Sequence, residues 1–301
     1  MTGVFCRTKI IIKSVMKKMK KIICATISIT LLFCLSSCGG TGSGGGANPS
    51  GGYTSAIVQD VSQNVPFTAN DFYSLSNEKK CWGQGYNVND KNQPTGSIDY
   101  NNKYGKYGGV FMGEKENTMY LTFDEGYENG YTAAILDTLK EKQVSAVFFV
   151  TYDYVKRNDE LVRRMINEGH IVGNHSWSHP SMPDLSVEEC RDEVQKLHDY
   201  VKENYNYEMV YIRPPRGEFS ERTLAVSQSL GYKSIFWSFA YKDYDVNNQP
   251  DADKAFTRIT EAAHSGAIYL LHAVSKTNTE ILGRVIDKWR SDGYTIAKFD
   301  I

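Results

Sequence analysis

The feature that most constrains this 301-residue chain is a regular alternation of strand and helix patterns from Thr118 to the C-terminus. Short β-prone or apolar runs alternate with segments whose apolar residues recur every three or four positions. The expected strands are 119–123, 145–150, 171–173, 209–212, 234–237, 267–271 and 294–297, and the expected helices are 131–141, 161–168, 187–201, 221–230, 252–264 and 281–289. Seven strands that alternate with helices predict a parallel sheet with helices outside, either as a barrel or as an open doubly wound sheet.

Other features of the sequence limit which fold and which function the chain can have. No GxGxxG or P-loop motif is present, which disfavours a nucleotide-binding open sheet. Residues 53–117 are polar and show little periodicity, so they predict a loop-rich N-terminal extension whose Trp82 and several tyrosines pack on the main domain. The 34 basic and 35 acidic residues nearly cancel, which argues against a protein that binds nucleic acid through bulk positive charge.

The N-terminus has the pattern of an export signal. Four lysines between positions 17 and 21 precede an apolar run over 22–35, which is shorter than the ~20 residues that a membrane-spanning helix needs. Residues 35–38, Leu-Ser-Ser-Cys, resemble a bacterial lipobox with Cys38 as the lipidated residue. We therefore expect a signal peptide over 1–38, a Gly/Ser linker over 39–52 and an extracytoplasmic body anchored to the membrane by lipid. The alternatives are an ordinary signal peptide or an uncleaved anchor, and Met16 or Met19 is an alternative start.

Only two cysteines, Cys81 and Cys190, remain in the body. They could form a disulfide in an extracytoplasmic setting, although the sequence alone does not show that they are close in space.

Polar clusters follow several of the expected strands. The carboxyl ends of parallel barrel strands meet at one face, where such folds carry their active sites. A carboxylate there can be a general base, a metal ligand or a solvated loop end, and a histidine that ends a buried strand can be a general acid or a satisfied core residue. The candidates are Asp124 and Glu125, His175 and His179, Arg213 and Arg216 on either side of two prolines, Asp243, and His272.

The spacing of two of these clusters is informative. On a helical turn, His175 and His179 at i and i+4 would point the same way, which suits a divalent metal, although many such pairs are structural. The prolines of the RPPRG segment stiffen its turn, and Gly217 permits an unusual φ. Such a backbone could aim an N–H at an oxyanion, or it could be only a tight connection with two surface arginines.

Taken together, the motifs resemble one family. TFDEG, HSWSH, RPPRG and LLH, in this order, resemble the motif blocks of the polysaccharide deacetylases, carbohydrate esterase family 4, over residues 118–301. The longer strings TFDEGYENGYT, VGNHSWSHP and CWGQGYNV are similar to the subgroup that de-N-acetylates muramic acid to form the muramic δ-lactam of the spore cortex. The resemblance implies a distorted (β/α)7 barrel with a loop-rich N-terminal extension.

The resemblance also implies a role for each candidate residue. Asp124 would be the general base and His272 the general acid, with Arg213 holding Asp124 and Asp243 tuning His272. A divalent metal, expected to be zinc, would be bound by His175, His179 and Glu125. Glu125 stands where the family usually has a shorter aspartate ligand, which puts the geometry of that contact in question.

The RPPRG segment carries a further implication. By the same resemblance, the backbone N–H of Arg216 would help to stabilise the oxyanion. Its side chain replaces a common aromatic residue and could pair with the lactyl carboxylate of muramic acid.

We therefore predict a monomeric, metal-dependent hydrolase that de-N-acetylates peptidoglycan amino sugars, with N-acetylmuramic acid as the expected target. One alternative is an N-acetylglucosamine deacetylase that acts on peptidoglycan, chitin or exopolysaccharide. An alternative of another class is a non-catalytic cell-wall-binding lipoprotein on a degenerate barrel.

Overall fold

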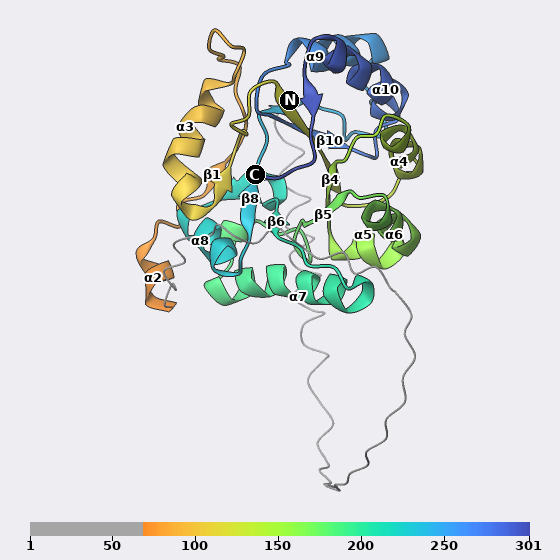
Figure 1. The fold of residues 1–301 in the computed structure, drawn as a ribbon. Helices are drawn as coiled ribbons and strands as arrows, with labels where there is room; N and C mark the ends of the chain where they lie inside the picture. Colours follow the sequence, from red (N-terminus) through yellow and green to blue (C-terminus); the bar gives the residue numbers. More distant parts are fainter. Residues whose placement is uncertain (1–68) are drawn as a thin grey trace, which may run out of the picture. The chain divides into compact units, whose positions relative to one another are not determined.

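The computed structural model describes residues 69–301 (Figure 1). The predicted signal peptide, Cys38, the Gly/Ser linker and the first part of the extension lie outside the described residues. Within 69–301, none of the helices has the length and apolar character needed to cross a membrane.

The centre of the fold is a parallel sheet that curls into a half-barrel, which agrees with the predicted distorted (β/α)7 barrel. The order across the sheet is β2 (Gly109–Val110), β8 (Lys233–Ile235), β6 (Tyr211–Ile212), β5 (Ile171–Asn174), β4 (Val147–Val150), β3 (Thr118–Glu125), β10 (Ala267–His272) and β9 (Phe239–Ala240), with β11 (Thr295–Ile296) paired to β3. Only residues 236–238 separate β8 from β9, which lie toward opposite ends of this order. Since three residues span about 10 Å, this short link brings the two sides of the sheet together.

Helices cover the outside of the sheet (Figure 1). They are α4 (Thr132–Glu141), α5 (Tyr152–Arg157), α6 (Asp159–Asn167), α7 (Val187–Tyr205), α8 (Glu221–Ser229), α9 (Ala252–Glu261) and α10 (Lys276–Ser291). The longest, α7, begins where Ser186 and Glu189 form a capping box, and its apolar stripe from Val187 to Val201 is buried. The six expected helices are all present, whereas the short helix α5 was not anticipated.

The alternation of side chains along each strand separates two parts of the core. On β4, Phe148 belongs to the large core cluster that includes buried residues of the covering helices, whereas its neighbour Phe149 packs with Tyr120, Ile235 and other residues of a separate cluster. Since neighbouring side chains of a strand point to opposite faces, the second cluster fills the inside of the curled sheet.

The strand register brings the expected functional residues to one edge. His272 lies opposite Asp124 in the β10–β3 pairing, and Asn174, the residue before His175, lies opposite Val150. All of these residues are at the carboxyl ends of their strands, so the face predicted for the site is where the side chains meet.

The N-terminal extension is loop-rich, but it also contains regular structure that its sequence did not indicate. It forms α2 (Ala69–Ser74), β1 (Lys80–Cys81), α3 (Thr95–Tyr104) and a 3-10 turn, η1 (Gly105–Tyr107), and β1 pairs with β7 (Glu218–Phe219). Its strand β2 joins the main sheet beside β8, so a boundary at residue 118 divides one sheet.

The expected packing of Trp82 on the main domain is confirmed. Its indole Nε1 donates to the carbonyl of Trp237 at 2.9 Å, and its ring packs against Phe111 at 4.6 Å between centroids. The two cysteines of the described chain do not form a disulfide: Cys81 is exposed and Cys190 is a buried free thiol.

Candidate active site

A cavity of about 450 Å³ opens at the carboxyl ends of the central strands. Tyr127 and Tyr244, both about half exposed, belong to its walls. The cavity is lined by four of the predicted site residues and by neighbouring loops: Asp124, Gly126, Tyr127, Thr151, Asp153, His175, Trp177, Ser178, His179, Tyr244, His272 and Val274.

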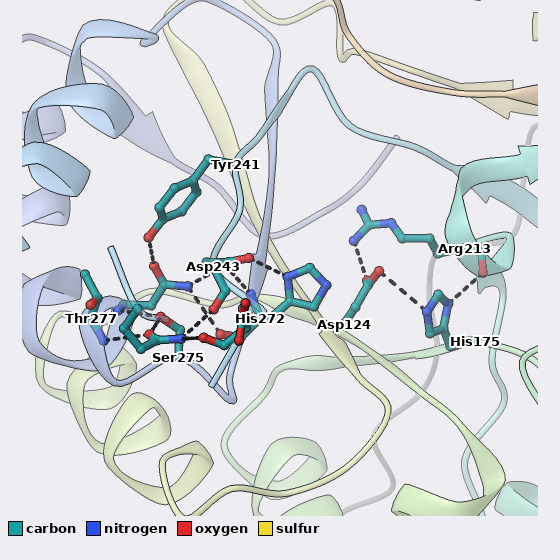
Figure 2. Close-up of polar contacts among 11 residues, drawn as sticks. Asp124, His175, Arg213, Tyr241, Asp243, His272, Ser275 and Thr277 are labelled. Carbon is teal, nitrogen blue, oxygen red and sulfur yellow. Dashed lines mark hydrogen bonds and ion pairs between the residues drawn. The ribbon is translucent and has the colours of Figure 1, made fainter. Parts of the chain in front are cut away.

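Asp124 is held by a fully buried arginine (Figure 2). The Nη1 of Arg213 donates to Asp124 Oδ1 at 2.7 Å, and its other nitrogens donate to the carbonyls of Ile235 and Phe236. Burial raises the pKa of Asp124, but Arg213, through its charge and its hydrogen bond, together with the nearby His175 and His272, outweighs this effect, and the pKa is lowered. Asp124 is therefore ionised and able to accept a proton.

His175 is oriented by a backbone carbonyl on the far side of its ring. Its Nδ1 lies 2.8 Å from the carbonyl oxygen of Arg213, which can only accept, so Nδ1 carries the hydrogen. The other nitrogen, Nε2, lies 3.5 Å from Asp124 Oδ2. Burial lowers the pKa of His175, and burial with the nearby His175 lowers the pKa of His179 to about 4. Both rings are thus neutral, with centroids 4.8 Å apart.

These two imidazoles fit a divalent metal. Neutral histidines whose second nitrogen is held by a carbonyl are typical metal ligands. No group of three His, Cys, Asp or Glu side chains within residues 69–301 converges closely enough to hold an ion. The donor set that the structure provides is therefore the histidine pair beside Asp124, and further ligands would have to come from water, substrate or a rearranged side chain.

Glu125 lies apart from that pair. Its side chain is fully buried, is absent from the cavity lining, and has no hydrogen-bond partner for either oxygen within the described residues. Because successive residues of β3 alternate between its faces, Asp124 and Glu125 project in different directions. Burial, followed by the nearby charge of Glu128, raises the pKa of Glu125 well above its usual value. Its role as a metal ligand stays a prediction.

His272 is the other candidate for proton transfer at the cavity. Its Nδ1 donates to Asp243 Oδ1 at 2.7 Å, and its backbone N–H donates to Asp243 Oδ2 at 2.8 Å. Burial lowers the pKa of His272, but the charge and hydrogen bond of Asp243 together with the charge of Asp124 outweigh this effect, and the pKa is raised (Figure 2). Nε2 of a protonated His272 is then free to give a proton to a bound group.

Sequence reasoning missed the residue that completes this pair. Asn278 Nδ2 donates to Asp243 Oδ2 at 2.7 Å, and its Oδ1 accepts from the hydroxyl of Tyr241. Asn278 lies in the first turn of α10, where Ser275 caps the helix, and no strand-end pattern marks it. Its only sequence signal is its place shortly after the LLH motif.

The RPPRG segment adopts the unusual backbone that its composition allows. Arg216 has φ of 60° and Gly217 of 65°, and a Cβ on Gly217 would lie 2.7 Å from the Trp237 ring. The exposed side chain of Arg216 donates from Nη2 to the carbonyl of His179 at 3.3 Å. The segment therefore braces the loop of the histidine pair, and Arg216 lies outside the residues that line the cavity.

Comparisons with known proteins agree with this geometry. Residues 112–235 match the model of the polysaccharide deacetylase family. The peptidoglycan-N-acetylmuramic acid deacetylase PdaA of Bacillus subtilis is 42% identical over 229 residues, which are 75% of this chain and 87% of PdaA. The chain belongs to the polysaccharide deacetylase family. This deacetylase is therefore a hydrolase of N-acetyl amide bonds, as predicted from its motifs, and the metal dependence that is general in the family applies to it.

Solved structures support the fold as well. The structure of Bacillus subtilis PdaA, a family 4 carbohydrate esterase, superposes with a TM-score of 0.71 at 40% identity, and covers 74% of this chain and 96% of that one. The structure of a family 4 carbohydrate esterase from Bacillus anthracis superposes with a TM-score of 0.62 at 41% identity, and the match covers 74% of this chain and 95% of that one. A family 4 pseudoenzyme from Bacillus anthracis is also similar, with a TM-score of 0.60 at 29% identity, and the match covers 64% of this chain and 67% of that one.

Proposed function

We propose that this deacetylase removes the acetyl group from N-acetylmuramic acid in peptidoglycan, a step toward muramic δ-lactam. The observation that carries the proposal is the pairing of an ionised Asp124 and a proton-donating His272 at one cavity, beside two neutral histidines. Similarity to a relative named as a peptidoglycan-N-acetylmuramic acid deacetylase favours this sugar.

The reaction follows from the protonation states of the two groups. Asp124, kept ionised by Arg213, accepts a proton from the attacking water, whose oxygen bonds to the amide carbonyl carbon. His272, kept protonated by Asp243, gives its proton to the amide nitrogen as the carbon–nitrogen bond breaks. The products are acetate and the free amine of the sugar, so that one water is consumed. The backbone N–H of Arg216 is proposed to donate to the negative oxygen of the tetrahedral intermediate.

His175 and His179 are the residues that would hold the metal, which we propose to be zinc because neutral imidazoles suit it. When bound, a divalent ion supplies a Lewis acid that makes water easier to deprotonate and polarises a carbonyl. Arg213 serves both parts of the site, since its side chain holds Asp124 and its carbonyl fixes the tautomer of His175.

Arg216 is proposed to distinguish muramic acid from glucosamine. Its guanidinium is exposed and makes, within residues 69–301, a single hydrogen bond of 3.3 Å, to the carbonyl of His179, so it has donors left for the lactyl carboxylate. A charge-assisted contact of this kind corresponds to a preference of about tenfold to a hundredfold for muramic acid without peptide, since an attached peptide converts the carboxylate to an amide.

Acetate release decides between the candidate functions. We would compare kcat/KM for peptide-free peptidoglycan and chitooligosaccharide, using the parent protein and Arg216→Gln. The proposal expects a parent preference for peptidoglycan that shrinks in the variant. A parent preference for chitooligosaccharide, or an equal loss on both substrates, would instead support the N-acetylglucosamine deacetylase. The absence of acetate release from every glycan, with metal supplied, would support a wall-binding protein without activity.

The place of action is a separate proposal. We propose that Cys38 carries lipid and holds the monomeric deacetylase on the outer side of the cell membrane, next to its polymeric substrate. Cys38→Ala is then expected to move the protein from the membrane fraction to the soluble fraction. Continued membrane association after correct signal cleavage would reveal another anchor.

A further inference from the structure

A second hollow, of about 700 Å³, lies between the extension and α9. Its walls come from residues 84–94 and from 238–264, including Tyr86, Val88, Lys254 and Arg258. None of its lining residues falls within the 112–235 segment that matches the family model, and none lines the catalytic cavity. The hollow is thus built by parts of the chain outside the segment that matches the family model, and its extension wall includes residues of the CWGQGYNV string.

The extension wall of this hollow is fixed by hydrogen bonds. Gln84 donates to the carbonyl of Ala240 at 3.1 Å and accepts from the indole of Trp237 at 3.0 Å. At the other end, Asn92 donates to the carbonyls of Glu261 and Ala263. These contacts tie the wall both to α9 and to the segment that leads to Asp243, so that the hollow keeps its shape without a ligand.

An aromatic ring stands free on this fixed wall. The side chain of Tyr86 is 96% exposed and that of Val88 is 51% exposed. Tyr86 directly follows Gly85, whose φ is +72°. Large apolar side chains that are exposed to solvent beside a hollow are typical of binding sites. Tyrosine suits such a role because its flat ring offers a large contact area and loses little conformational entropy.

The opposite wall, on α9, adds charges. Neither Lys254 nor Arg258 forms an ion pair or a side-chain hydrogen bond with any residue in the described 69–301 region. Two acidic residues, Asp253 and Glu261, also line the hollow. Asp253 is paired, since its Oδ1 lies 3.4 Å from Arg284 Nη2. Unpaired cations beside an exposed aromatic ring suit a ligand that offers both carboxylates and apolar sugar faces.

We propose that this hollow is a second glycan-binding site, which holds a carboxylate-bearing amino-sugar polymer away from the catalytic cavity. The Tyr86 ring lies against the carbon–hydrogen face of a sugar, and Lys254 and Arg258 pair with carboxylates of the lactyl group or of the stem peptide. The inference rests on the proposed function for its choice of peptidoglycan. Its effect is to keep the enzyme on an insoluble polymer between turnovers.

Binding is measured without turnover, in the full mature chain with Asp124→Asn, by co-sedimentation with insoluble peptidoglycan. Adding Tyr86→Ala is expected to weaken binding about fivefold to tenfold, the value of one aromatic contact. The control is Tyr73→Ala, which removes a half-exposed tyrosine on α2 outside the hollow and is expected to bind as the parent does. Unchanged binding by the Tyr86→Ala protein, with thermal unfolding like that of the parent, would overturn the proposal.

The charge contribution is tested with three polymers: intact peptidoglycan, peptide-free peptidoglycan and chitin. Lys254→Gln with Arg258→Gln is expected to weaken binding to peptidoglycan but not to chitin, which carries no carboxylate. A loss confined to the peptide-free polymer identifies the lactyl carboxylate, and a loss confined to the intact polymer identifies the stem peptide. Lys233→Gln with Arg191→Gln changes the net charge equally at other sites and is the control. An equal loss on chitin would contradict the proposal.

Failure of this inference is separable from failure of the proposed function. With Asp124 intact, Tyr86→Ala is expected to release acetate from a short soluble muramic substrate at the parent rate, because such a substrate reaches only the catalytic cavity. If the parent itself releases no acetate, the proposed function is wrong, while the binding comparison among polymers still tests the second site.

Discussion

The two sides of the catalytic cavity each contain a carboxylate and a cationic partner, but in opposite order. On one side the carboxylate of Asp124 lines the cavity and the cation, Arg213, is fully buried behind it. On the other side His272 lines the cavity and the carboxylate, Asp243, is fully buried behind it (Figure 2).

This reversal suits two similar ion pairs to the opposite tasks that we propose for them. In each pair the buried partner does not line the cavity, and its charge shifts the pKa of the partner that does. Arg213 lowers the pKa of Asp124 against the effect of burial, as the proposed base requires. Asp243 raises the pKa of His272 against the same effect, as the proposed acid requires. The tests that follow remove each member in turn.

The largest loss is expected for the exposed member of the first pair. Asp124→Asn removes the proton acceptor but keeps an oxygen that can accept from Arg213. We expect kcat/KM for acetate release to fall by about 10⁴-fold, the upper range for a general base, and the melting temperature to change little. Activity within tenfold of the parent would show that another group accepts the proton.

Replacement of His272, the exposed member of the second pair, is expected to slow the hydrolysis of amide and ester substrates to different extents. His272→Gln removes the proton donor, so acetate release from a glycan amide should fall by about 10³-fold. An activated phenyl acetate ester has a leaving group that needs no proton, and its hydrolysis is expected to fall less than about tenfold. Equal losses on amide and ester would contradict the assignment of His272 as the acid.

Loss of a buried member is expected to affect stability as well as rate. Arg213 makes three hydrogen bonds from three nitrogens, and Lys in its place has one nitrogen for all of them. We expect Arg213→Lys to lower the free energy of unfolding by about 2–4 kcal/mol, because buried carbonyls lose their donors, and kcat by about thirtyfold. Chemical denaturation and acetate release measure the two effects. An unchanged unfolding free energy would show that the buried pair does not stabilise the fold.

The same comparison shows what the sequence could and could not predict. Asp124 and His272 each end an apolar strand, so their meeting at one edge follows from a parallel sheet. Their partners were assigned through the family resemblance, since Arg213 lies 89 positions from Asp124 and nothing local couples the two. Asn278 escaped prediction because its contact with Asp243 depends on how α10 packs, which no periodic pattern encodes.

The extension was predicted less well, for a related physical reason. Its strand β2 has only two residues, and Gly109 and Val110 are held in the sheet by pairing with Ser234 and Ile235. Such short segments have no periodicity to detect, because tertiary pairing rather than local propensity makes them strands. Trp82 could be predicted because a large aromatic residue in a polar segment has few ways to be buried.

The smallest of the expected effects is that of replacing the buried carboxylate of Asp243. The replacement is expected mainly to shift the pH dependence of kcat. Asp243 accepts from His272 Nδ1, from the His272 backbone N–H and from Asn278. Asparagine has one acceptor oxygen and no charge, so Asp243→Asn removes the main influence that raises the pKa of His272 and leaves burial, which lowers it, with only the smaller contribution of Asp124 against it. His272 acts as an acid only while protonated, which holds below its pKa. The alkaline limb of the kcat profile should therefore move to lower pH.

The size of that shift provides the sharpest comparison of the two pairs. A change of about one pKa unit gives about a tenfold loss of kcat above the limb and little loss below it. The acidic limb is the control, because Asp124 and Arg213 are untouched and should keep it in place. An alkaline limb that stays where it was, or a uniform loss at every pH, would mean that Asp243 only positions the ring. The two pairs would then differ in kind, with charge acting in one and geometry alone in the other.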